Sequence, residues 1–307
     1  MLDSATTETE HRTRQAARSI KRSMLAYLRL TKPRIIMLLL VTTVPAMILA
    51  EQGFPSPWLI LATLAGGSLA AAGANAINCY LDRDIDQLMN RTQNRPIPAG
   101  QVEPERAVLF GIALGGLGFV VMEVFTNLLA ALLTLAAFAF YVLVYTAVLK
   151  RATPLNIVIG GAAGAVPPLA GWAAVTGEVG ASALVLFGII VLWTPPHFWA
   201  LSLNYRDDYG KANIPMLPVI VGEEETKRQI FLHTLALVAF SVLLYPLGTA
   251  GLVYLASALA LGALFIYYAV RMWRDPSPKA TSTLFRYSIL YLALLFSAVA
   301  ADGLSTV

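Results

Sequence analysis

Long apolar stretches alternate with short charged segments along the whole chain. Nine stretches are long enough, at about 17–25 residues each, to cross a bilayer as helices, and they cover approximately residues 35–51, 57–80, 107–125, 127–148, 156–176, 181–203, 229–248, 251–270 and 286–304. None shows the alternation of polar and apolar positions that a membrane β-strand needs. Because helices satisfy their own backbone hydrogen bonds in lipid, the pattern predicts an all-α fold, a polytopic membrane bundle of nine transmembrane helices.

The positive charges are segregated between the two sides of this predicted bundle. All 22 Lys and Arg residues lie before the first apolar stretch or in every second loop, whereas the intervening loops carry Glu51, Glu178 and Asp302. The positive-inside rule then predicts a multi-pass protein of the cell (inner) membrane, with a cytoplasmic N-terminus and an external C-terminus. Residues 1–23 are predicted to form a polar, basic arm, and residues 24–307 a single nine-helix membrane domain.

Composition supports the same class of protein. The chain is 57% hydrophobic and 13% charged, whereas a soluble domain is typically about 45–50% apolar and about 25% charged. The formal net charge of +4 is modest, and we expect no nucleic-acid partner. A single cysteine, Cys79, excludes an intramolecular disulfide framework.

A dense cluster of ionisable residues follows the second apolar stretch, in NCYLDRDIDQLMNRTQNRPIPAG (residues 78–100). Asn78, Asp82 and Asp86 recur at i, i+4 and i+8, so they share one face if the second helix continues past its apolar part. Carboxylates packed in this way repel one another unless a cation lies between them. Mg²⁺ prefers one or two carboxylates together with water and phosphate oxygens, so the spacing predicts metal-bridged phosphate binding. The alternative is a solvated loop whose charges end the helix.

Basic residues on the same side complete this predicted site. Arg91 and Arg95 follow at another i, i+4 interval and are suited to gripping a diphosphate. Tyr145, Lys150 and Arg151 lie in YTAVLKRATPLN, in a loop on the same side of the bundle. We expect Asp84 to point away from the predicted metal ligands.

A second acidic helix end follows the sixth apolar stretch, in ALSLNYRDDYGKANIPMLP (residues 200–218). Asn204 and Asp208 repeat the spacing of the first motif, with Asp207 beside them. Segments two and six are four helices apart and end on the same side, so a weak parallel repeat is expected to bring both acidic ends over one cavity.

This arrangement fits a ligand with an anionic head and a long hydrocarbon tail, such as a prenyl diphosphate. Metal ions and basic side chains stabilise the charge that develops on a departing diphosphate. The apolar interior accommodates the tail and keeps water from an allylic cation.

The chain resembles the UbiA superfamily of intramembrane prenyltransferases over roughly residues 24–300. The resemblance is carried by DRDIDQLMNRTQNRP, YTAVLKRATPLNIVIGGAAGAVPPLAGW and WTPPHFWALSLNYRDDYGKANIPMLP. The last two segments are similar to the members that farnesylate haem rather than a quinone precursor. The resemblance implies nine helices around a central cavity open toward the cytoplasmic side.

The activity that this resemblance implies is Mg²⁺-dependent transfer of farnesyl from farnesyl diphosphate to a vinyl group of haem B. Water adds in the same reaction and gives haem O for terminal oxidases. Mg²⁺ is the implied cofactor, and haem B is a substrate. The implied partners are farnesyl diphosphate, haem B, the lipid bilayer and, as a candidate, a haem A synthase.

The site residues expected from the motifs and the resemblance fall into four groups. The catalytic group is Asn78, Asp82, Asp86, Asn204, Asp208 and Tyr145; the diphosphate-binding group is Arg91, Arg95, Lys150, Arg151 and Lys211; the metal ligands are Asp82, Asp86, Asp207 and Asp208; the acceptor-binding group is His197 and Trp193.

Two features depart from the pattern common in the superfamily. The second motif has Asn204 and Ala212 where aspartates are frequent, and Asp207 and Lys211 are both candidates for the missing function. Tyr145 and Lys150 are separated by four residues rather than the three of a Tyr-x-x-x-Lys motif.

His197 lies within the sixth apolar stretch, where an ionisable side chain is a functional candidate. It is suited to ligating haem iron, placing a propionate or guiding the added water; a hydrogen bond to a neighbouring helix is the alternative. Trp193 is suited to stacking on a porphyrin, although tryptophans also anchor helices at membrane interfaces.

Two other functions are compatible with parts of the pattern. One is the same chemistry with another acceptor, such as a quinone precursor or chlorophyllide. The other is a transporter or cation channel with an acidic vestibule, against which Arg91, Arg95 and Lys150 argue because they would crowd a cation entrance.

Overall fold

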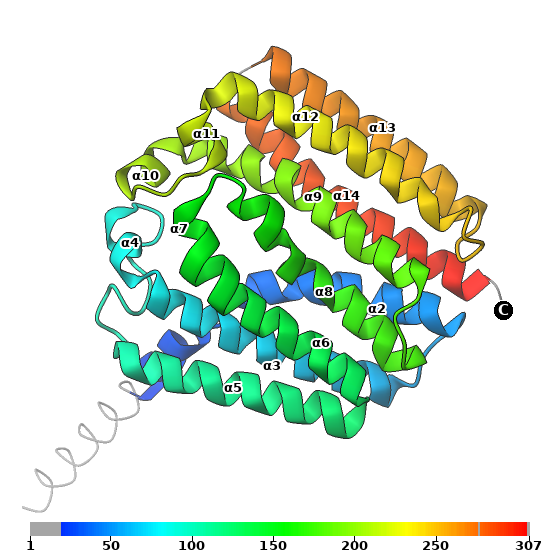
Figure 1. Cartoon of the computed structure of the whole chain (residues 1–307), viewed down its shortest axis with the longest axis horizontal. Coiled ribbons are helices and arrows are strands. Elements are labelled where there is room, and N and C mark those ends of the chain that lie inside the picture. Colours follow the sequence, from blue (N-terminus) through cyan, green and yellow to red (C-terminus); the bar gives the residue numbers. More distant parts are fainter. Residues whose placement is uncertain (1–19, 276, 306–307) are drawn as a thin grey trace, which may run out of the picture.

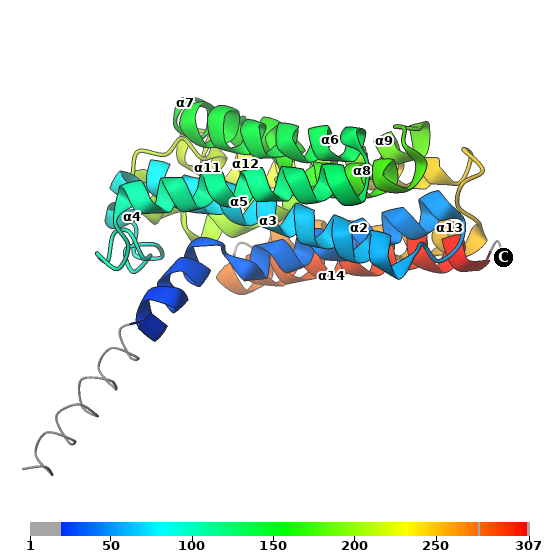
Figure 2. The same ribbon diagram turned by 90° about the horizontal axis from the view of Figure 1, so that it is seen from below.

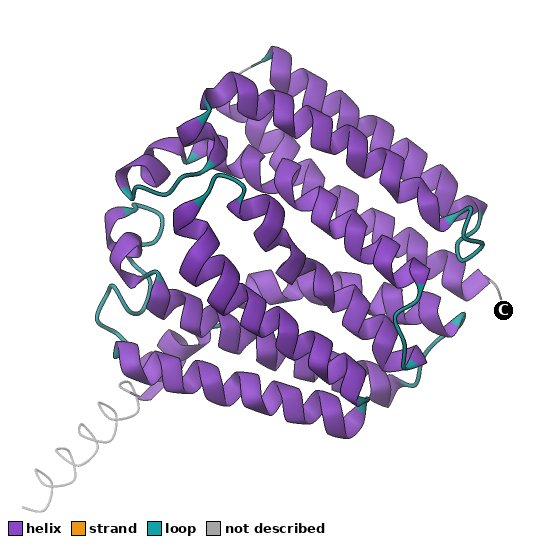
Figure 3. Cartoon of the chain, viewed as in Figure 1, coloured by secondary structure: helices purple, strands orange, loops and turns teal. Residues whose placement is uncertain are grey.

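The computed structural model describes residues 20–275 and 277–305, and all regular structure in this part of the chain is helical (Figure 3). Nine helices within these residues are long and apolar enough to cross a membrane, which confirms the predicted all-α class. Most of the predicted N-terminal arm, residues 1–19, lies outside the described residues. Residues 20–30 form one helix, which passes without interruption through the predicted arm boundary.

The spans follow the predicted order. They are α2 (Pro33–Glu51), α3 (Pro57–Leu81), α5 (Pro104–Phe125), the composite of α6 (Leu128–Ala139), π-helix η1 (Phe140–Leu149) and α7 (Lys150–Ala152), α8 (Asn156–Thr176), α9 (Ala181–Asn204), α12 (Gly222–Ser241) with its final turn η2 (Val242–Leu244), α13 (Leu252–Arg274) and α14 (Pro278–Ser305).

The helix ends differ most from prediction at α12 and α14, which begin seven and eight residues before the predicted 229 and 286. Glu223, Glu224 and Glu225 occupy the first turn of α12, where negative charge is favourable to the helix dipole. A hydropathy pattern detects only the apolar part of such helices, because their polar ends project beyond the hydrocarbon.

The bundle places its short helices at one end. Figure 1 shows α12 and α13 along one side and α3 with α5 along the other, with α8 and α9 between them. The short helices α4 (Arg83–Leu88), α10 (Arg206–Lys211) and α11 (Leu217–Ile220) lie at the same end, on the left of this view. Helix α4 follows α3, and α10 follows α9. Both acidic helix ends therefore lie at one end of the bundle, as predicted.

Small residues allow the closest helix contact, between α3 and α5. A Cβ atom placed on Gly73 would lie 2.4 Å from the carbonyl oxygen of Gly111, and one on Gly111 would lie 2.5 Å from the side chain of Ile77. Helices in lipid associate through this kind of close backbone packing, because burying apolar side chains between them gains little free energy when the surrounding lipid is also apolar. This contact holds the helix that carries the first motif.

An acidic residue at the opposite end of the bundle is structural. Asp302 is buried on α14, and its Oδ2 accepts hydrogen bonds from the backbone N–H groups of Gly251 (2.6 Å) and Tyr254 (2.9 Å). These donors belong to the first turn of α13, which needs partners for its unpaired N–H groups. Asp302 therefore caps a neighbouring helix.

Candidate active site

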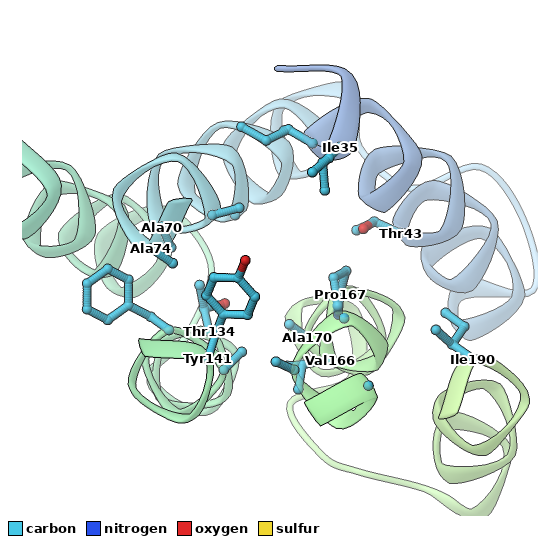
Figure 4. A pocket seen from close by; sticks show the side chains of 18 of the residues that line it. Ile35, Thr43, Ala70, Ala74, Thr134, Tyr141, Val166, Pro167, Ala170 and Ile190 are labelled. Atoms are coloured by element: carbon cyan, nitrogen blue, oxygen red, sulfur yellow. The ribbon is translucent and has the colours of Figure 1, made fainter. Parts of the chain in front are cut away.

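An apolar cavity of about 330 Å³ lies among α2, α3, α6, η1, α8 and α9. Figure 4 shows Ala70 and Ala74 of α3 facing Val166, Pro167 and Ala170 of α8 across it. Most of its lining residues are apolar, and they include Gly160 and Gly164 of α8. This lining suits a hydrocarbon chain.

Polar side chains form a minority of the lining of this cavity, and three of them lie near the motifs. They are Asn75 on α3, Tyr145 on η1 and His197 on α9. The hydroxyl group of Tyr141 also projects into the open space (Figure 4). The polar end of a bound molecule thus has defined places to contact.

The i, i+4 backbone hydrogen bonds of the first motif continue beyond the end of its helix. α3 stops at Leu81, and Asp82 (φ −89°, ψ 0°) joins it to α4. The N–H of Asp82 still donates to Asn78 O (2.9 Å), and that of Asp86 donates to Asp82 O (2.8 Å). The predicted i, i+4 progression therefore continues, and Asn78, Asp82 and Asp86 are all buried.

Basic side chains neutralise the two buried carboxylates. Lys150 Nζ lies 2.5 Å from Asp82 Oδ2, which also accepts a hydrogen bond from the side-chain amide of Asn78 (2.8 Å). Arg95 Nη1 donates to both carboxylate oxygens of Asp86 at 2.9 and 2.8 Å. Two predicted diphosphate-binding residues, Arg95 and Lys150, are therefore brought to the cluster.

The oxygen donors of this cluster fit a divalent ion that takes only part of its coordination from the protein and the rest from a substrate and water. The described residues contain no group of three or more His, Cys, Asp or Glu side chains arranged around a metal position. Mg²⁺ in phosphate-binding sites uses one or two carboxylates and takes its other oxygens from water and phosphate. Asp82 Oδ1 is buried without a hydrogen-bond partner, so this oxygen suits a metal ligand. The metal-binding roles of Asp82, Asp86, Asp207 and Asp208 all stay predictions.

The second motif contacts the first through its only buried carboxylate. Asp208 on α10 accepts hydrogen bonds from the side-chain amide of Asn90 (3.2 Å) and from the N–H of Arg91 (3.4 Å). Asn90 and Arg91 follow α4, so the two acidic helix ends meet as the sequence predicted. Asp207 and Lys211 on the same short helix are exposed.

Asn204 does not join this cluster. It is exposed, and its side-chain amide donates to Ser282 Oγ of α14 (3.1 Å). The repeated spacing does not give Asn204 and Asp208 the geometry of the first motif, because the helix tightens between them. The N–H of Tyr205 bonds to Ser202 O (3.2 Å), three residues back, and the described backbone has no hydrogen bond from Asp208 N to Asn204 O.

The unusual spacing of Tyr145 and Lys150 has a structural explanation. Both lie in or directly after η1, where backbone hydrogen bonds join residues five apart. The N–H of Lys150 donates to Tyr145 O, so one π-helical turn aligns a pair that an α-helix would align at four. The wider turn of the π-helix therefore accommodates the extra residue between Tyr145 and Lys150.

The π-helix also supports the first motif. Thr146 is fully buried; its hydroxyl donates to Tyr141 O (2.8 Å) and accepts from the side-chain amide of Asn78 (3.1 Å). On the cavity side, the ring of Tyr145 packs so closely on Gly160 that an added Cβ would lie 2.2 Å from it.

The comparison with known families now settles the class of protein. The sequence model of the UbiA prenyltransferase family matches residues 39–295. The chain belongs to the UbiA prenyltransferase family. It is 55% identical over 294 residues to a protoheme IX farnesyltransferase of Gloeobacter violaceus, covering 94% of this chain and 96% of that one. It is 52% identical over 281 residues to one of Gloeothece citriformis, covering 91% of this chain and 87% of that one.

Solved structures show the same UbiA fold at much lower identity. A digeranylgeranylglyceryl phosphate synthase superposes with a TM-score of 0.76 at 20% identity, covering 92% of this chain and 99% of that one. A UbiA homologue of Archaeoglobus fulgidus bound to GPP and Mg²⁺ superposes with a TM-score of 0.68 at 20% identity, covering 89% and 99%. This chain therefore has the UbiA arrangement of helices.

The side chains of two predicted diphosphate-binding arginines of this UbiA enzyme do not pair with the buried carboxylates. Arg91 is exposed, covers the ring of Tyr205 and donates to the hydroxyl of Tyr209 (3.2 Å). Arg151 pairs with the exposed Asp84 (2.6 Å) and donates to Leu81 O. This pairing lowers the pKa of Asp84 to about 2, chiefly through the hydrogen bond from Arg151. Asp84 points away from the cluster, as predicted.

His197 is fixed in a definite tautomer on the cavity wall. Its ring is stacked between Trp193 (4.2 Å between centroids) and Phe285 (4.7 Å), and Nδ1 lies 2.7 Å from Ser288 Oγ. The single hydroxyl proton of Ser288 is donated to Phe285 O (2.7 Å), so Ser288 Oγ accepts a hydrogen bond from the Nδ1–H group of His197. Nε2 of the neutral ring therefore carries a free lone pair.

Lys32 is a site residue that sequence reasoning missed. Its Nζ lies 2.5 Å from Asn78 Oδ1. The sequence places Lys32 in a run of basic residues, Arg12 to Arg34, that predicts orientation or contact with anionic lipid and no role in the site. Its burial lowers the pKa of Lys32 to about 8. The one available signal was its position directly before Pro33, at the start of a membrane helix.

Proposed function

We propose that this enzyme transfers farnesyl from farnesyl diphosphate to a vinyl group of haem B, with addition of water, to form haem O for terminal oxidases. The observation that carries the proposal is a buried, cation-paired carboxylate cluster that follows on α3 from Asn75, a residue that lines an apolar cavity of about 330 Å³. The choice of farnesyl and haem is supported by relatives that are 51–55% identical over at least 90% of this chain and are named protoheme IX farnesyltransferase.

The diphosphate head would bind at the first motif. Lys150 and Arg95 already lie beside Asp82 and Asp86, and they are positioned to offer charged hydrogen bonds to phosphate oxygens. Asp82, through its unpartnered Oδ1, is the residue best suited to hold Mg²⁺. When bound, Mg²⁺ would withdraw charge from the departing diphosphate.

The apolar cavity would hold the farnesyl chain and exclude bulk water. The bond between C1 and the bridging oxygen breaks, and diphosphate leaves with the electron pair. The vinyl group of haem B attacks the resulting allylic cation and forms the new carbon–carbon bond. Water then adds to the carbocation beside the porphyrin and loses a proton, so the reaction needs no covalent enzyme intermediate. The protein contributes alignment and charge stabilisation.

The acceptor would lie on the side of α9. His197 presents an unprotonated Nε2, and Trp193 holds it by stacking while its own Nε1–H donates to Ser288 O (2.8 Å). Such a nitrogen is suited to ligating haem iron or to accepting the proton of the added water. We expect His197→Ala to raise the KM for haem B more than the KM for farnesyl diphosphate; equal effects on both would remove His197 from the acceptor side.

The proposed location is the inner cell membrane, with the motif end of the bundle and the N-terminus facing the cytoplasm. A haem A synthase is a candidate partner because it would use haem O. Cysteine labelling of the loop between α3 and α5, compared with the loop between α8 and α9, would test the orientation.

The decisive experiment is mass analysis of haem extracted from membranes that contain the full chain. Membranes supplied with haem B, farnesyl diphosphate and Mg²⁺ should form a product heavier by one farnesyl group and one hydroxyl group, with matching release of pyrophosphate. Omission of Mg²⁺ or of farnesyl diphosphate should prevent this. Unmodified haem, together with prenylation of an added quinone precursor, would contradict the proposal.

A further inference from the structure

A lysine from the N-terminal segment lies inside the cluster of the first motif. Lys32 joins helix 20–30 to α2 in a left-handed backbone conformation (φ 52°), which is uncommon for a residue with a side chain. From there, Nζ reaches Asn78 Oδ1 at 2.5 Å. Asn78 in turn donates to Asp82 Oδ2, the oxygen that Lys150 contacts. Lys32 and Lys150 therefore approach the same Asn78–Asp82 pair.

Lys32 creates an excess of positive charge at this place. Asp82 is paired with Lys150, and Asp86 is paired with Arg95. Lys32 is half-buried, and its observed partner is a neutral amide. Three cations thus surround two buried carboxylates. A partly desolvated ammonium group beside an apolar cavity is stabilised by a further anion.

The position of this lysine is determined by packing rather than by a free chain end. Ala26 and Leu30 of helix 20–30 are buried in one cluster with residues of α3. Thr31 O accepts a hydrogen bond from the side-chain amide of Asn75 (3.1 Å), a residue that lines the cavity. Figure 2 shows helix 20–30 extending away from α2 below the bundle, so Lys32 lies at the bend between them.

We propose that Lys32 is a further binding residue for the diphosphate group of the prenyl substrate, carried into the site by the N-terminal helix. This inference rests on the proposed function. A lysine ammonium has three donors; Asn78 uses one, and two stay available to phosphate oxygens. Lys32 would donate hydrogen bonds to the diphosphate from the side of α2, while Lys150 would donate from the side of η1.

The test compares variants of the full chain purified in detergent, with inorganic pyrophosphate and Mg²⁺ as the probe. Lys32→Met should raise the pyrophosphate concentration that gives half-maximal thermal stabilisation by about tenfold or more, the loss expected for a charged hydrogen bond. Lys32→Arg should recover part of this affinity. Arg29→Met, which removes an exposed charge from the same segment, should leave it unchanged.

Kinetics identify which substrate Lys32 contacts. The KM for farnesyl diphosphate should rise in Lys32→Met and Lys32→Gln while the KM for haem B stays constant. A rise for haem B alone would overturn the proposal and assign Lys32 to an acceptor carboxylate. Unchanged pyrophosphate binding in either variant, with an unfolding temperature equal to that of the wild type, would overturn it as well.

Failure of the proposed function can be distinguished from failure of the Lys32 assignment. If wild-type enzyme binds pyrophosphate through Lys32 but leaves haem B unmodified, the diphosphate site stands and the acceptor assignment is wrong. If wild-type enzyme forms haem O and Lys32→Met retains its affinity for both substrates, only the assignment of Lys32 is wrong.

Discussion

The two acidic helix ends share an Asn-x-x-x-Asp spacing but differ in what surrounds them. At the end of α3, Asn78, Asp82 and Asp86 are all buried. At the end of α9, Asn204 is exposed and only Asp208 is buried. The difference arises in the backbone, because hydrogen bonds at i, i+4 continue through Asp82, whereas the chain tightens at Tyr205. Equal spacing in sequence therefore gives equal geometry only where the helical register survives the end of the helix.

The two ends also differ in how they are held. The first end is contacted by Lys32 before α2, by Thr146 and Lys150 on the fourth span, and by Arg95 of its own loop. The second is held through Asn90 and the backbone of Arg91. The second site thus depends on the loop of the first, so we expect substitutions at the first end to have larger effects.

The largest effect is expected for Asp82→Asn. The substitution keeps the size of the side chain but removes the charge that faces Lys150 and the oxygen suited to Mg²⁺. We expect kcat for pyrophosphate release to fall by roughly 10²–10³-fold, the range for loss of one preorganised electrostatic group. Asp84→Asn is the matched control, since Asp84 is exposed and paired outside the cluster. Near-normal turnover of Asp82→Asn would remove the distinction between the two ends.

A smaller loss is expected for Asp208→Asn. The new amide would present a donor to the N–H of Arg91 or to the amide of Asn90, so one hydrogen bond of about 1.5–3 kcal/mol is lost. We expect kcat/KM to fall about tenfold to a hundredfold, with a higher Mg²⁺ concentration for half-maximal rate. Asp207→Asn, at an exposed position on the same helix, tests the predicted metal-binding role of Asp207, and an unchanged Mg²⁺ dependence would remove that role. A larger fall in kcat/KM for Asp208→Asn than for Asp82→Asn would contradict the proposal that the second acidic end depends on the first.

Gly160→Ala tests the support that η1 gives to the first end. The added Cβ would meet the Tyr145 ring at 2.2 Å, so Tyr145 must shift. Overpacking of this kind costs about 1–3 kcal/mol in the free energy of unfolding, measured by thermal unfolding in detergent alongside the KM for farnesyl diphosphate. Gly164→Ala lies one turn further along α8, where an added Cβ would meet no neighbouring side chain or helix within 4 Å, and should not lower stability. Equal behaviour of the two variants would contradict the tight Tyr145 contact.

The smallest effect is expected for Asn204→Ala. Its side chain bonds only to Ser282 at the surface among the described residues, and such substitutions usually change stability by no more than about 0.5 kcal/mol. Turnover and Mg²⁺ dependence should match the wild type. A tenfold fall in kcat would show that Asn204 reaches the substrate during turnover, which would make the two ends more alike than their geometry indicates.

Much of the fold and part of the site could be predicted from the sequence. Hydropathy determines which segments enter lipid, because each span must supply its own backbone hydrogen bonds, and the nine predicted spans agree with those of the structure. The spacing of Asn78, Asp82 and Asp86, and the four-helix interval to Asp208, predicted two acidic ends that meet. These features are local or follow from the alternating direction of successive helices, so the order of residues is enough to determine them.

The tertiary structure alone decided which charges meet at the cluster. Lys32 and Arg151 belong to equally basic stretches, yet Lys32 reaches Asn78 and Arg151 turns outward to Asp84. Asn204 leaves its motif, and the π-helix brings Tyr145 and Lys150 into register. The physical reason is that a long side chain can reach several places from one backbone position. Its partner is determined by how helix ends rotate and pack against each other, which the spacing within a single helix does not contain.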